Sequence, residues 1–120
     1  MKRILLMDDS QLFLAVTASA LQAAGYEVVC ANDLAELAEL REQSSSDLVL
    51  MDVQMPEAYG EDIAFTLRHG HGIAAPIYLL SSLDEADLAD RVQWAGIDGF
   101  ISKQLGVEAI VDRVRTIVKP

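Results

Sequence analysis

Five polar side chains that could take part in chemistry each follow a short apolar run of the sequence. They are Asp8 and Asp9 after ILLM, Asp52 after LVLM, Ser81 after IYLL, and Lys103 after FIS. Each has an ordinary explanation on its own, because such an aspartate or serine often caps a turn or helix and such a lysine often extends to water. Their shared position at the end of an apolar run suggests that they meet at one place.

The types of these side chains limit the chemistry that they could perform if they lie close together. Three carboxylates brought together repel one another unless a cation lies among them. Oxygen ligands without histidine or cysteine favour a hard cation, and few carboxylates with room for water suit Mg²⁺ better than a closed calcium cage. A metal ion beside a carboxylate, with an ammonium and a hydroxyl nearby, is the set of groups that phosphoryl transfer requires. Asp52 is then the candidate nucleophile, assisted by Lys103 and Ser81.

The elements that must position these residues are short strands. Continuous apolar runs stand at 4–7, 28–31, 48–51 and 77–80, with a weaker one at 100–101. Continuous rather than alternating apolar runs are typical of strands covered on both faces, as in a parallel sheet.

Longer segments with helical spacing lie between the strands. They include 10–24, which ends at a glycine, then 33–43, 85–95 and a last helix that begins at 107. Strands that alternate with helices imply right-handed crossovers and helices on both faces of the sheet.

At this size the alternation predicts a flavodoxin-like (βα)5 fold of the α/β class, with five parallel strands in the order 2-1-3-4-5. Strands 1 and 3 are neighbours in that order, and ligands of such sheets bind at the carboxyl ends where the strand order reverses. The carboxylates of Asp8, Asp9 and Asp52 are therefore expected within a few ångströms of one another.

Composition narrows the possible functions. The chain has 120 residues with 52% hydrophobic content, which predicts one domain over 1–120. Nineteen acidic residues against nine basic ones give a net charge of -10, which opposes direct binding of nucleic acid or of an anionic membrane. The first apolar run is only four residues long, too short for a signal peptide or a membrane span, so we expect a cytoplasmic, soluble protein.

On these residues the sequence resembles the receiver domains of two-component response regulators, over all 120 residues. Any one of the matching motifs is a weak signal, but the five occur in order on the expected elements. They are the acidic pair Asp8-Asp9, the DVQMP box at 52–56, Gly60, Ser81, and AGIDGFISK at 95–103.

The resemblance implies a phosphorylation-dependent signalling switch. Asp52 would accept a phosphoryl group from a phosphohistidine on a sensor histidine kinase or a histidine phosphotransfer protein. Asp9, Asp52 and the backbone carbonyl of Gln54 would bind Mg²⁺ directly, and Asp8 would act through bound water. Lys103 would pair with the carboxylate before transfer and with the phosphoryl oxygen after it.

The same resemblance implies how the signal leaves the site. Ser81 would move to bond a phosphoryl oxygen, and Phe100 would turn inward as the aromatic switch residue. The fourth helix, the fifth strand and the last helix would form the surface that controls a downstream effector protein or domain, and a phosphorylation-dependent dimer is compatible with this scheme. Because the chain would phosphorylate and dephosphorylate only itself, we do not class it as an enzyme.

One residue departs from the family's pattern. The family usually has proline after the lysine, often with a cis peptide bond before it, and this chain has Gln104. A cis bond before a residue other than proline costs about 2.5 to 4 kcal/mol. We therefore predict a trans Lys103-Gln104 peptide and a rearranged loop after it.

Two further features of the sequence allow simple expectations. The segment RHGHG at 68–72 is predicted to be a solvated loop. Helical spacing places Trp94 on the outer face of its helix, among Asp87, Asp90 and Arg91. The ring either folds over neighbouring aliphatic stems or anchors a partner protein.

Two alternative functions belong to other classes. The first is a receiver-like docking module that works without phosphorylation. The only sequence feature that favours it is the missing proline after Lys103. The second is a flavin-binding electron carrier on the same fold, which needs a glycine- and hydroxyl-rich phosphate loop after the first strand. The segment MDDSQLF has two carboxylates there, and these would repel a flavin phosphate.

Overall fold

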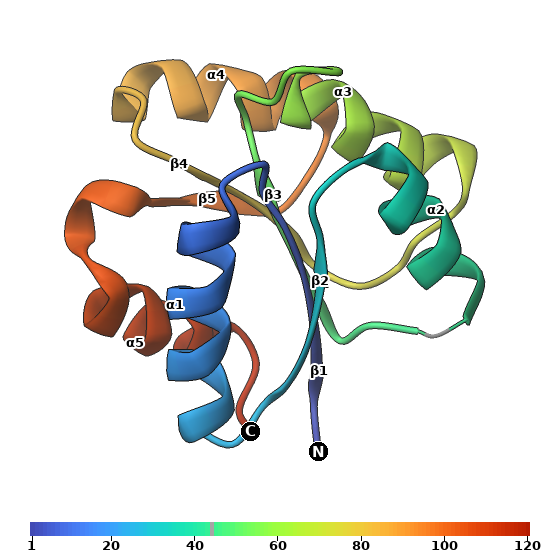
Figure 1. The fold of residues 1–120 in the computed structure, drawn as a ribbon. Helices are drawn as coiled ribbons and strands as arrows, with labels where there is room; N and C mark the ends of the chain where they lie inside the picture. Colours follow the sequence, from blue (N-terminus) through green and yellow to red (C-terminus); the bar gives the residue numbers. More distant parts are fainter. Residues whose placement is uncertain (44) are drawn as a thin grey trace.

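Five parallel strands form a single sheet in the order β2-β1-β3-β4-β5 (Figure 1), which confirms the predicted topology. The computed structural model describes residues 1–43 and 45–120. The strands are β1 (Arg3–Met7), β2 (Glu27–Ala31), β3 (Leu48–Asp52), β4 (Ile77–Ser81) and β5 (Gly99–Ser102). The helices are α1 (Gln11–Ala23), α2 (Leu34–Gln43), α3 (Gly60–Phe65), α4 (Glu85–Ala95) and α5 (Val107–Ile117).

Helices cover both faces of the sheet and divide the core into two layers. Figure 1 shows α1 and α5 together on one face, with α2, α3 and α4 on the other. Successive residues of β1 alternate between the layers, because Leu5 and Met7 pack under α2 to α4 while Ile4 and Leu6 pack under α1 and α5. This alternation explains why an apolar run without polar interruptions is needed in a strand that is covered on both sides.

Capping residues mark the ends of α1 and α4. The hydroxyl of Ser10 accepts a hydrogen bond from the amide of Phe13, which satisfies one free N–H of the first turn of α1. Asp84 caps α4 in the same way, and α4 ends at Gly96 in the left-handed conformation. Ser10 and Asp84 thus fix the start of the two helices that follow Asp9 and Ser81.

The segment 68–72, predicted to be a solvated loop, is exposed at 69–72 as expected, but 68–70 are helical. Residues Thr66–Gly70 continue α3 as a π-helix. The ring of His69 lies 4.5 Å from the ring of Phe65, and its Nε2 atom lies 3.2 Å from the carbonyl oxygen of Ala95. Contacts with the end of α4, which lies far along the chain, therefore order a glycine-flanked segment.

None of the helices in the described parts of the chain has the length and apolar character that a membrane crossing needs.

Candidate functional site

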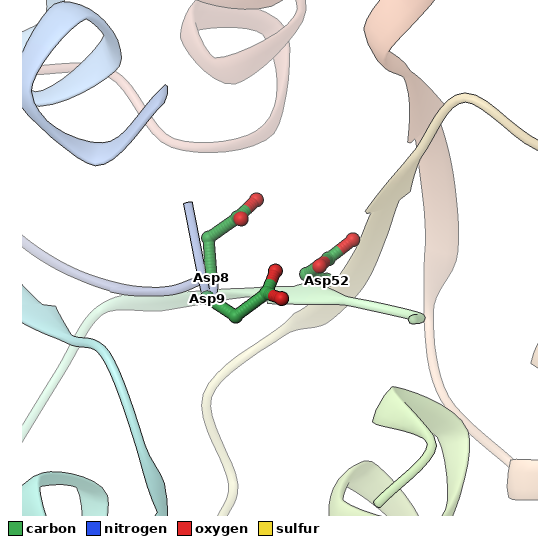
Figure 2. Close-up of side chains that lie close together, drawn as sticks. All are labelled: Asp8, Asp9 and Asp52. Carbon is green, nitrogen blue, oxygen red and sulfur yellow. The ribbon is translucent and has the colours of Figure 1, made fainter. Parts of the chain in front are cut away.

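Three carboxylates converge where β1 and β3 end. Asp8 and Asp9 directly follow β1 and Asp52 is the last residue of β3, with the register placing Met7 opposite Met51. Oxygen atoms of the three side chains lie within 4.8 Å of one another. Figure 2 shows them at neighbouring strand ends. Asp8 and Asp52 are buried, and Asp9 is exposed to solvent. The convergence that was expected from the strand order is present in the structure.

Lys103 supplies the counter-charge to this cluster from the end of β5. Its Nζ atom lies 2.6 Å from Oδ2 of Asp8 and 3.3 Å from Oδ1 of Asp52. The ammonium also lies 4.2 Å from the ring centroid of Phe13, on α1, where the face of the ring attracts a cation. One ammonium against three carboxylates leaves the cluster with an excess of two negative charges.

The buried position of Asp52 changes its acidity. Loss of solvent and, next, the neighbouring Asp8 carboxylate raise the pKa of Asp52 from 3.8 to about 6, although Lys103 acts in the opposite direction. A carboxylate that is costly to ionise in the bare site gains from a nearby divalent cation. The excess negative charge and the all-oxygen donor set fit Mg²⁺, for which the cluster is a candidate site.

Gln54 lies two residues beyond Asp52, at the start of the loop between β3 and α3. It forms an isolated antiparallel bridge with Tyr59, and the amide of Gly60 donates to the carbonyl of Val53 over 2.8 Å. These bonds fold the loop back onto the end of β3, which holds the backbone of Gln54 close to Asp52.

The two switch candidates lie on adjacent strands. Ser81 is the buried last residue of β4, and its Oγ atom accepts a hydrogen bond from the amide of Leu83 over 3.2 Å. Phe100, the second residue of β5, is half-buried and packs against the core layer under α4. Since β3 and β4 pair Asp52 with Leu80, Ser81 lies one residue beyond the phosphoacceptor candidate.

The loop at Gln104 contains a contact that the sequence did not suggest. The described residues include no cis peptide bond, as predicted for Lys103-Gln104, and 103–105 form a 3₁₀ turn. The Gln104 amide donates to Oγ of Ser102 over 3.2 Å, and its side-chain Nε2 donates to the carbonyl of Ser82 over 3.0 Å. Gln104 thus joins the loop after Ser81 to the loop that carries Lys103.

Replacing Gln104 by alanine is expected to lower the free energy of unfolding by about 0.5–1 kcal/mol, because an exposed hydrogen bond between two loops is lost. Hydrogen exchange at the backbone amides of 82–84 should become faster. Gln93→Ala on α4 is the matched control, since no hydrogen bond of its side chain occurs in the described structure. Equal exchange rates at 82–84 in Gln104→Ala and in the unmodified chain would show that this bond does not hold the loop.

Trp94 is exposed on the outer side of α4, with its ring centroid 5.3 Å from that of Phe65 on α3. The ring therefore lies on the α3 side of α4. The sequence placed Trp94 outward but had no signal for this aromatic neighbour, because the two residues belong to different helices.

Comparison with known proteins agrees with the geometry. The chain matches the response regulator receiver domain over residues 4–115. It is 32% identical over 118 residues to the transcriptional regulatory protein PdtaR of Mycobacterium tuberculosis, covering 98% of this chain and 57% of that protein. It is 33% identical over 115 residues to the CAI-1 autoinducer sensor kinase/phosphatase CqsS of Vibrio cholerae, covering 94% of this chain and 17% of CqsS. The chain thus spans only part of the length of these relatives.

Solved structures of similar proteins share the whole fold. The chemotaxis protein CheY4 of Vibrio cholerae superposes with a TM-score of 0.89 at 24% identity, covering 98% of this chain and 99% of CheY4. The response regulator TrrA of Thermotoga maritima, solved in complex with Mg(2+)-BeF, superposes with a TM-score of 0.83 at 28% identity, covering 98% and 100%.

Proposed function

Because this chain belongs to the response regulator receiver domain family, we propose that it is a phosphorylation-dependent switch whose phosphoacceptor is Asp52. The single observation that supports this most directly is the cluster itself, in which Lys103 lies between two of three converging carboxylates. A phosphohistidine on a sensor histidine kinase or a histidine phosphotransfer protein is the proposed donor. The N–P bond of the donor breaks, an O–P bond to the Asp52 carboxylate forms, and the imidazole leaves with its electron pair.

Asp9, Asp52 and the carbonyl oxygen of Gln54 are the proposed direct ligands of Mg²⁺. Both oxygens of Asp8 already accept hydrogen bonds, from the Ser10 amide over 2.9 Å and from Lys103, which supports a role for Asp8 through bound water. When bound, Mg²⁺ would neutralise charge on the phosphoryl oxygens.

Lys103 and Ser81 are the proposed partners of the transferred group. Lys103 pairs with the Asp52 carboxylate before transfer, and it would pair with a negatively charged phosphoryl oxygen afterwards. Ser81 Oγ acts as an acceptor toward Leu83, so its own hydrogen can be donated to a phosphoryl oxygen. These contacts exist only after phosphorylation and would favour a different position of the loop after β4.

The proposed output is a change on the α4-β5-α5 surface. Phe100 lines a surface cavity of about 400 Å³ there, together with Tyr78, Leu105 and Arg113. Inward rotation of the half-buried Phe100 ring would reshape this cavity and alter the affinity for a downstream effector protein. A phosphorylation-dependent dimer through this surface and a cytoplasmic location are part of the same proposal.

Incubation with acetyl phosphate or phosphoramidate and Mg²⁺, followed by intact mass measurement, tests the phosphoacceptor. We expect a gain of one phosphoryl group that is lost in Asp52→Ala and on removal of Mg²⁺ by a chelator. Asp90→Ala, which removes an exposed carboxylate of α4, should keep the gain. Uptake by Asp52→Ala would assign the phosphoryl group to another residue. No uptake by the unmodified chain under any condition would favour the docking module that works without phosphorylation.

A further inference from the structure

The exposed aromatic side chains of this protein gather in one place. Of its seven aromatic residues, four are buried or half-buried. The other three are Tyr59, Phe65 and Trp94, which are 57%, 41% and 59% exposed. Tyr59 directly precedes α3, Phe65 is its last residue, and Trp94 lies on α4. We call these three residues the aromatic face. Figure 1 shows α3 and α4 side by side. None of the three residues belongs to the three-carboxylate cluster.

Contacts between the two helices hold the aromatic face in place. The ring of Phe65 lies 5.3 Å from that of Trp94 and 4.5 Å from that of His69. The guanidinium carbon of Arg91 lies 5.8 Å from the ring centroid of Tyr59. Rings that already support one another lose little conformational freedom when a partner binds, so the face is prepared for an interface.

The charges around the aromatic face are acidic. Arg91 forms an ion pair with Glu61 across the two helices, so its charge is already matched. Asp62, Asp87 and Asp90 are exposed, and none of them takes part in an ion pair within the described part of the chain.

Helical spacing places these carboxylates at the edge of the face. Asp90 and Asp87 precede Trp94 by four and seven residues on α4, and Asp62 precedes Phe65 by three on α3. Such spacings put side chains on one side of a helix.

We propose that the aromatic face is a docking surface for a basic amphipathic segment of another protein. A large apolar side chain of that segment would pack on Phe65 and Trp94, while its lysine or arginine residues would meet Asp62, Asp87 and Asp90. A second copy of this chain fits less well, because each copy carries a net charge of -10 and would bring the same acidic edge to the contact. The aromatic face lies on the α3 side of α4 and shares no residue with the cavity at Phe100. The inference does not rest on the proposed switch.

The experiment uses Trp94, the only tryptophan, as its reporter. The probe is a synthetic amphipathic helix of leucine and lysine, titrated at low salt, with a leucine and glutamate peptide of equal length for comparison. We expect the lysine peptide to shift Trp94 emission to shorter wavelength with a micromolar Kd that weakens as salt is added. The glutamate peptide should leave the emission unchanged.

Variants distinguish binding at the aromatic face from non-specific attraction of a basic peptide to an acidic protein. Calorimetry measures the affinity of each variant. We expect the affinity for the lysine peptide to fall at least tenfold in Phe65→Ser and in the double variant Asp87→Asn, Asp90→Asn. The double variant changes only exposed residues and preserves the test if Phe65→Ser fails to fold. Leu12→Ser, at a 75% exposed position on α1, is the control and should retain affinity.

Three outcomes would overturn the proposal. They are equal loss of affinity in Leu12→Ser and the double variant, equal binding of the glutamate peptide, or loss of Trp94 exposure through self-association of the chain without peptide.

Discussion

Replacing Gly60 by alanine is expected to destabilise the folded chain by about 3 kcal/mol or more, beyond the usual range for a surface substitution. A β-carbon at this position would overlap the carbonyl oxygen of Asp52, and would lie 2.7 Å from the carbonyl carbon of Asp52 and 3.0 Å from Cα of Val53. All three are backbone atoms, so no side-chain rotation can relieve the contact. Either α3 or the end of β3 must move.

The Gly60 substitution should also impair phosphoryl uptake, because the displaced backbone is that of Asp52 itself. Chemical denaturation measures the first effect, and intact mass after acetyl phosphate treatment measures the second. Gly70→Ala is the control, since the nearest atom to its added carbon is a Thr66 methyl at 3.6 Å. If Gly60→Ala were as stable as Gly70→Ala, α3 could not approach β3 as closely as the structure shows.

Replacing Asp52 by asparagine is expected to stabilise the metal-free chain at pH 7 to 8 by on the order of 2 to 3 kcal/mol. The cause is the pKa of Asp52, which burial and then Asp8 raise from 3.8 to about 6 in the folded chain. The folded state therefore holds this proton more tightly than the unfolded state. Its stability falls as the pH rises from about 4 to about 6, and the loss persists above that range. Asparagine cannot ionise, so the variant avoids the loss.

Chemical denaturation between pH 4 and pH 8, in the presence of a chelator, measures this effect as the difference in free energy of unfolding between Asp52→Asn and the unmodified chain. Asp90→Asn, an exposed carboxylate of α4, should follow the unmodified chain. Added Mg²⁺ should then stabilise the unmodified chain far more than Asp52→Asn, because the ion binds the folded state through Asp52. If Asp52→Asn were no more stable than the unmodified chain at pH 8 without metal, ionisation of Asp52 would not destabilise the folded chain.

Much of the candidate site could be predicted because its residues lie at strand ends. The runs at 4–7 and 48–51 indicated buried parallel strands, and the rule that neighbouring strands bring their carboxyl ends together was sufficient to group Asp8, Asp9 and Asp52. Lys103 joined them for the same reason, since β5 ends at the same edge of the sheet.

Other features of the site could not be predicted, because they depend on distances between loops. The sequence shows Gln104 only as a departure from the family's proline, whereas its bond to the Ser82 carbonyl requires two loops to approach within hydrogen-bond distance. The sequence shows Gly60 only as part of a motif. The reason for glycine there is that the backbone of Asp52 occupies the space of a β-carbon, which only the packing of α3 on β3 reveals. The glycines of 68–72 predict a loop, because the sequence does not show that His69 contacts the carbonyl oxygen of Ala95 at the end of α4.

The sequence by itself determined the alternation of strands and helices, the burial of the strands on both faces and the identity of the charged groups at their carboxyl ends, while the strand order came from the general rule for folds of this kind. Those follow from apolar periodicity and chain direction, which are local properties summed along the chain. Only the tertiary structure decided that Lys103 contacts both Asp8 and Asp52, and that Trp94 of α4 meets Phe65 of α3 rather than facing α5. Those contacts join residues on separate elements, and periodicity assigns a side chain to a face of its own helix without identifying the neighbour across it.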